Sequence, residues 1–189
     1  MDASLTKSGE HFTLALERRL PHGPAKVWRV VAERELLHQW FPAHVIGEWK
    51  VGAELRFEFQ HGEGDGLPEE ELRGEVLAVE PERLLEFRWG TSVLRCELIP
   101  DGDGCRLLFS ENIADASMGA RNAAGWEFCL QNFEALLEGA ATAKFVLDVW
   151  RERFDHYVGV FQPQFGPQQG PPETHSAVVA EKADKGNLA

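Results

Sequence analysis

The chain has 189 residues and a formal net charge of −12, from 31 acidic and 19 basic side chains. Such an acidic surface repels phosphate groups and anionic lipid headgroups, which excludes nucleic acid and membrane surfaces as expected partners. The length fits one domain, and six Trp and twelve Phe residues can build a core that needs neither disulfide nor metal.

The cysteines and the N-terminus indicate the cellular compartment. The three cysteines are odd in number and form no CxxC pair, which is typical of reduced thiols in a cytoplasmic protein. Residues 1–10 contain no apolar signal segment, and no run approaches the roughly 18 apolar residues of a membrane span. We expect a soluble, cytoplasmic protein in which residues 1–10 form a flexible N-terminus.

A strand and two short helices are predicted next. Residues 12–18 alternate between apolar and polar side chains, which is the pattern of a strand with one buried face. Apolar residues then recur at helical spacing between residues 27 and 41, and Pro42 ends the pattern. We expect two short helices here, with a break near residues 32–34.

A long run of alternating segments follows, from residue 54 to residue 111. Explicit turns separate the segments, and Asp-Gly between two alternating segments is the strongest short hairpin signal. The pattern therefore predicts about six antiparallel strands. The expected inner face carries Leu85, Phe87, Trp89, Leu94, Cys96, Leu98, Leu107 and Phe109.

Two helices and a tail complete the chain. A long helix is predicted over residues 118–138, with Gly139 as its C-cap, and a second amphipathic helix over 144–161. From Gln162 onward the Pro, Gly and Gln content cannot build a core, so residues 162–189 are expected to be a disordered tail.

The long helix has one broad apolar stripe, which includes Trp126, Cys129, Leu130 and Phe133. A curved sheet must cover its apolar face, and this helix supplies the cover. The stripe then either packs into a filled core or forms one wall of a cavity, and periodicity alone does not separate the two.

Several segments, in order and spacing, resemble one known family. They read PHGPAKVWRVV, LLHQWFP, VGAELRFEF, RLLEFRWG, LRCELIPDGDGCRLLFSEN and AAGWEFCLQNFEALLEG. The chain resembles, over residues 12–161, the bacterial proteins grouped with the activator of heat-shock-protein-90 ATPase. These proteins belong to the START/birch-pollen-allergen-like (SRPBCC) superfamily.

The resemblance implies an α+β helix-grip fold over residues 11–161. In this fold a curved antiparallel sheet wraps around a long C-terminal helix, with two short helices after the first strand. It also implies an apolar cavity between sheet and helix, which in the wider superfamily holds lipids, sterols or polyketides. The expected ligand-binding lining is Trp40, Phe57, Phe59, Phe87, Trp89, Leu94, Leu98, Phe109, Trp126, Leu130, Phe133 and Leu137.

A few polar residues are candidates for contacts with a ligand or a metal. Arg18 shares the inner parity of its strand, so it either reaches the pocket rim and pairs with a ligand, or is released to solvent by strand twist. His38 and His44 flank the corner at Pro42 but have no evident third partner for a metal. We therefore expect no metal and no cofactor.

Three functions fit these patterns. The first is a module that binds a small, largely apolar molecule. The second is a cyclase or hydrolase acting on aromatic or polyketide-like substrates, which needs a titratable group in the cavity. The expected inner positions are almost all carbon, so we expect no such group, and no catalytic motif is present. The third is a chaperone-associated or stress-response interaction; the sequence is also compatible with a homodimer.

Overall fold

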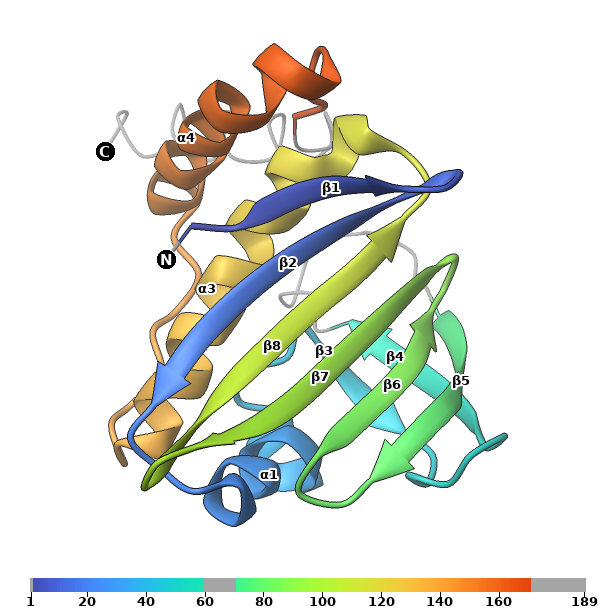
Figure 1. Ribbon diagram of the computed structural model, residues 1–189, viewed down its shortest axis with the longest axis vertical. Helices are drawn as coiled ribbons and strands as arrows, with labels where there is room; N and C mark the ends of the chain where they lie inside the picture. The colour runs from blue at the N-terminus through green and yellow to red at the C-terminus, as the bar shows by residue number, and fades with distance from the viewer. Residues whose placement is uncertain (1, 60–70, 171–189) are drawn as a thin grey trace, which may run out of the picture.

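The computed structural model describes residues 2–59 and 71–170, and within them eight strands form one antiparallel sheet (Figure 1). The order across the sheet is β1-β2-β8-β7-β6-β5-β4-β3. The strands are β1 (Ser4–Ser8), β2 (His11–Leu20), β3 (Ala43–Ile46), β4 (Glu54–Phe59), β5 (Glu71–Glu80), β6 (Leu84–Trp89), β7 (Ser92–Asp101) and β8 (Gly104–Ile113). The predicted Asp-Gly hairpin is confirmed, because Asp101 pairs with Gly104 and Gly102 has a φ of +61°.

The helices lie at the two points that the sequence predicts. They are α1 (Pro24–Ala32), α2 (Arg34–Leu37), the short 3₁₀ helix η1 (Ala116–Met118), α3 (Gly119–Leu137) and α4 (Leu147–Phe165). The break between α1 and α2 falls at Glu33, whose backbone is extended and serves as the cap of both helices. Among the helices of the described segments, none is long and apolar enough to cross a membrane.

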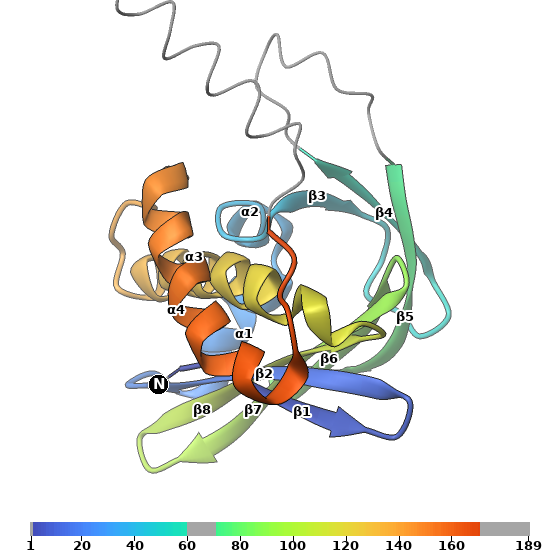
Figure 2. The ribbon, with the colours of Figure 1, turned by 90° about the horizontal axis from the view of Figure 1, so that it is seen from above.

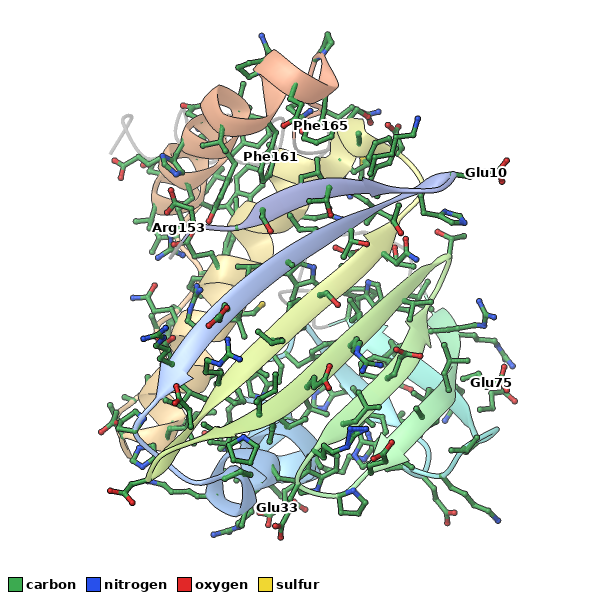
Figure 3. All side chains as sticks on the ribbon, in the orientation of Figure 1. Glu10, Glu33, Glu75, Arg153, Phe161 and Phe165 are labelled. Atoms are coloured by element: carbon green, nitrogen blue, oxygen red, sulfur yellow. The ribbon has the colours of Figure 1, made fainter. Side chains whose placement is uncertain are left out.

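The sheet curves around α3, which confirms the predicted helix-grip architecture (Figure 2). Part of the bend occurs at β5, where the pairing with β6 shifts between Val76 and Ala78. Gly74 also lets two strands approach closely, since a Cβ atom there would lie 1.9 Å from the carbonyl oxygen of Arg88. Charged side chains such as Glu10, Glu33 and Glu75 lie at the periphery (Figure 3).

The concave side of the sheet and α3 enclose the core. The predicted inner-face residues are buried, except that Trp89 is only partly buried. On α3, Leu130, Phe133 and Leu137 are at most 3% exposed. The greater part of the α3 stripe is therefore a filled core, where close packing excludes water.

The N-terminus differs from the expected flexible segment, because it contains the edge strand β1. Leu5 is buried, and the backbone N–H of Ala3 donates to the Tyr157 hydroxyl of α4 at 3.1 Å. The connection to β2 turns at Gly9, whose φ of +63° is left-handed. The segment has too few apolar residues to show an alternating pattern, so the sequence did not predict this strand. Backbone pairing with β2 holds it in place.

The C-terminal part also differs from the expected disordered tail, up to residue 170. Helix α4 continues past the predicted end to Phe165, whose ring meets Phe12 of β2 edge to face at 5.9 Å. Figure 3 shows Phe161 and Phe165 beside the β1 edge of the sheet. Beyond the helix, Gln168 Oε1 accepts the backbone N–H of Ala120 at 3.0 Å. The prediction for residues 171–189 lies outside the described residues.

Candidate ligand pocket

An open pocket of about 840 Å³ lies beside α3. Its walls come from four parts of the chain that are distant in sequence. These are the corner 39–42 after α2, the β6–β7 turn at 89–92, one face of α3, and the start of α4 together with Phe145 in the linker before it. The sheet contributes Leu72 of β5 and Glu111 of β8.

The face of α3 that lines the pocket is adjacent to the core stripe. Asn122, Gly125, Cys129 and Asn132 recur at steps of three and four residues, so they lie on one side of the helix. Trp126 lies at the boundary and takes part in both the pocket wall and the core. The stripe that is visible in the sequence is therefore mainly core, and the pocket uses its edge.

Aromatic rings at the Trp40–Phe41 corner form the opposite wall. The Trp40 indole donates its Nε1–H to the Val30 carbonyl oxygen at 2.8 Å, which ties the corner to α1. The Phe41 ring lies 5.0 Å from the Trp89 ring and 5.7 Å from the Trp126 ring, between centroids. These contacts are within the range of favourable aromatic pairs.

The outer edge of the pocket depends on the linker between α3 and α4. Asn132 is 5% exposed and makes two hydrogen bonds with the backbone of Ala143, at 3.1 and 2.8 Å. These two hydrogen bonds fix the linker two residues before Phe145, whose ring packs edge to face against the ring of Phe128. Phe145 is 54% exposed, so an apolar side chain lies at the pocket mouth.

A carboxylic acid lies in the pocket wall on the sheet side. Glu111 of β8 is 2% exposed, and its neighbours across the sheet are Leu14 and Leu94. Its Oε2 accepts the indole N–H of Trp126 at 2.8 Å and the amide N–H of Asn122 at 3.0 Å. Both donors come from α3, one helical turn apart, so the helix and the sheet meet at this carboxyl.

Opposing effects set the pKa of Glu111. Burial is the largest effect and raises the pKa above that of an ordinary glutamate, because desolvation disfavours the charged form. Hydrogen bonds from Trp126, Asn122 and Ser92, and the positive charge of Arg121, act in the opposite direction. A raised pKa in a pocket is typical of functional carboxyls.

The structure brings together only part of the lining expected from sequence. Trp40, Trp89 and Trp126 border the pocket. The other apolar residues of the expected lining do not border the pocket and belong to the core or pack against it: Phe57, Phe59, Phe87, Leu94, Leu98, Phe109, Leu130, Phe133 and Leu137. Arg18 does face inward, but its Nε lies 3.0 Å from Oε1 of Glu134 on α3, away from the pocket.

The expectation that the inner positions offer no titratable group is wrong, because of Glu111. The signal was present in the sequence, since Glu111 continues the inner parity of Leu107 and Phe109 on the same strand. The predicted run of strands ends at residue 111. The strand instead continues to Ile113, which is buried as well.

Other reactive groups contribute less to the site. Cys129 lines the pocket, but burial raises its thiol pKa to about 12, so it stays protonated at neutral pH. His38 and His44 stack with their ring centroids 3.5 Å apart. Within residues 2–59 and 71–170, no group of three or more His, Cys, Asp or Glu side chains is arranged to hold a metal.

Solved structures share this fold. The structure of EF2215 from Enterococcus faecalis, a conserved protein of unknown function, has a TM-score of 0.68 at 22% identity, over 85% of this chain and 91% of that chain. CalU16 from Micromonospora echinospora has a TM-score of 0.64 at 19% identity, over 85% and 94%. DynU16, a protein in the dynemicin biosynthetic locus, has a TM-score of 0.59 at 24% identity, over 70% and 49%.

The family comparison covers the part of the pocket from the Trp40–Phe41 corner to α3, but not the part that α4 contributes. No curated protein matches the chain. The family model "Activator of Hsp90 ATPase homolog 1-like protein" matches residues 21–138, which is more than half of the 189 residues. The chain therefore belongs to the Activator of Hsp90 ATPase homolog 1-like family.

Proposed function

We propose that the protein binds a small, largely apolar molecule in the pocket beside α3. The observation that carries this proposal is a pocket of about 840 Å³ whose walls are rich in aromatic side chains. This volume is within the range of sites that enclose drug-sized ligands. A lipid, a sterol or a polyketide-like molecule would have suitable size and polarity.

Desolvation of the ligand would supply most of the binding free energy. Apolar surface removed from water contributes about 25 cal/mol per Å². Two of the pocket tryptophans have their N–H groups engaged, Trp40 by Val30 and Trp126 by Glu111. Their rings can therefore cover an apolar ligand without leaving an indole N–H unsatisfied.

A single substitution in α3 tests the pocket directly. Gly125 lines the pocket, and a Cβ atom built there meets no atom within 4 Å. Gly125→Phe should place a benzyl group in the pocket while improving the helix propensity of the position. The probe is pyrene, and the signal is tryptophan quenching, because Trp40, Trp89, Trp126 and Trp150 border the pocket.

The matched control is Gly159→Phe on α4. This glycine is also helical and open around its Cβ, but it does not border the pocket. The wild-type protein and Gly159→Phe should bind pyrene with the same affinity, and Gly125→Phe should bind at least about tenfold more weakly. Equal affinities of all three proteins, or no saturable quenching of the wild type, would contradict the proposal.

One observation favours a second candidate function, catalysis on the bound molecule. Acid–base chemistry needs a titratable group in contact with the substrate, and Glu111 in the pocket wall is such a group. An ester or polyketide-like substrate would be offered at several pH values. Turnover that Glu111→Gln abolishes, without loss of pyrene binding, would establish an enzyme; turnover unaffected by Glu111→Gln would remove this candidate.

A further inference from the structure

The Glu111 carboxyl has acceptor capacity beyond what the protein uses. Side chains of Trp126, Asn122 and Ser92 hydrogen-bond to it. An ionised carboxyl offers about four acceptor positions. At least one position is then left for a group that enters the pocket.

The helix holds this carboxyl in a fixed orientation. Asn122 and Trp126 both donate to the same oxygen, Oε2, from consecutive turns of α3. Leu14 and Leu94 flank Glu111 in the sheet and are fully buried, so the carboxyl has no route to bulk water on those sides. An acceptor that is held in place before binding loses little conformational entropy when a ligand arrives.

The surroundings select a neutral donor over a cation. Glu111 is the one acidic residue among the described residues that border the pocket, and Arg121 borders the same pocket. The Arg121 charge already acts on the Glu111 carboxyl. A ligand ammonium would meet that guanidinium as well as the carboxylate, and would have to leave water to enter an apolar pocket.

We infer that Glu111 recognises a hydroxyl group on an otherwise apolar, ring-containing ligand, so that the pocket prefers hydroxylated molecules to their unsubstituted counterparts. The inference rests on the proposed function and adds the polar group by which the ligand is selected. The rings would lie against the Trp40, Trp89 and Trp126 side chains, and the hydroxyl would donate to the carboxyl. While the Glu111 carboxyl is ionised, a hydrogen bond to it is strong enough to dominate such a choice.

Three fluorescent probes of nearly equal shape test this inference. They are pyrene, its monohydroxylated derivative and its aminomethyl derivative, which is cationic at neutral pH. The wild-type protein should bind hydroxypyrene at least about tenfold more tightly than pyrene, and the cationic probe more weakly than hydroxypyrene.

Two variants assign the preference to Glu111. Glu111→Gln keeps an oxygen for the Trp126 and Asn122 donors, so it should fold, and the preference for hydroxypyrene should fall to a few-fold. The matched control is Glu86→Gln on β6, whose carboxylate pairs with Arg95 at 2.9 Å outside the pocket and whose replacement should leave the preference unchanged.

The outcomes separate this inference from the proposed function. Equal binding of pyrene and hydroxypyrene by the wild type, or an undiminished preference for hydroxypyrene in Glu111→Gln, would overturn the role of Glu111 while pyrene binding still supports the pocket. Tighter binding of the cationic probe than of hydroxypyrene would overturn the choice of a neutral hydroxyl. Failure of the wild type to bind any probe would overturn both proposals.

Discussion

The contribution of the hydrogen bond between Trp126 and Glu111 to stability can be predicted by comparing Trp126 with Trp40, a tryptophan in a similar setting. Trp126 Nε1 donates to Glu111 Oε2 at 2.8 Å, and Trp40 Nε1 donates to the Val30 carbonyl oxygen, also at 2.8 Å. The two indoles are 6% and 4% exposed. Replacing each with Phe is therefore the same chemical change at nearly equal burial, but one acceptor is a carboxyl group and the other a neutral carbonyl.

The expected costs differ because of the acceptor. A buried hydrogen bond to a charged group contributes about 1.5–3 kcal/mol, and a neutral one about 0.5–1.5 kcal/mol. Loss of indole volume adds a similar amount to both variants. Trp126→Phe should then lower the free energy of unfolding by about 1 kcal/mol more than Trp40→Phe, while Glu111 is ionised.

The difference in unfolding free energy between Trp126→Phe and Trp40→Phe should depend on pH. The pKa of Glu111 is raised on folding, so its contribution to stability is fully present below the unfolded pKa and is lost as the pH rises through the folded pKa. Among the hydrogen bonds that lower the pKa of Glu111, the one from Trp126 has the largest effect. Trp126→Phe should therefore raise this pKa further and increase the loss of unfolding free energy at high pH. Below the folded pKa the carboxyl is neutral, and the two variants should have nearly equal stability losses.

Urea unfolding of the wild type and both variants at a series of pH values measures this difference. The gap between the variants should be about 1 kcal/mol in mildly alkaline buffer and close to zero in acid. A gap that is the same at every pH would refute the reasoning, because it would mean that the Glu111 charge plays no part. A larger loss in Trp40→Phe than in Trp126→Phe would refute it as well.

Further predictions concern glycines, a thiol and the C-terminal segment. Gly125→Ala should raise the free energy of unfolding by about 0.5–1 kcal/mol, because its Cβ enters open space, and a loss would contradict the described geometry. Gly74→Ala should lower it by about 2 kcal/mol or more through the clash with the neighbouring strand; a neutral effect in urea unfolding would show that the strands separate easily. Cys129, with its pKa raised to about 12, should resist alkylation at neutral pH until the protein unfolds, so rapid labelling of the native state, seen by mass spectrometry, would speak against its burial. Gln168→Ala should cost about 1 kcal/mol through loss of its hydrogen bond to Ala120, and unchanged thermal stability would show that this segment is not held.

Local patterns predicted the fold well where one element carries its own signal. Alternation along β6, β7 and β8 and the Asp-Gly turn were sufficient to predict the antiparallel strands, because strand period and turn geometry are local properties. The edge strand β1 was missed because an edge is held by backbone pairing with a neighbour, which leaves little trace in hydrophobicity. The prediction that residues 162–170 are disordered was wrong for a related reason. Gln168 and Gln169 are polar, and hydrogen bonds hold Gln168 to α3 and Gln169 to η1.

Apart from the short strands β1 and β3, the sequence by itself determined the class of the elements and their order, as well as the apolar stripe of α3, since each follows from the period of one chain segment. The tertiary structure decided which side of that stripe is filled and which is open. Curvature of the sheet and the rotation of α3 against it place Phe133 in the core and Gly125 at the pocket. The same rotation brings the Trp126 and Asn122 donors to Glu111, 15 and 11 residues away in the chain, and this contact between helix and sheet has no periodic signature.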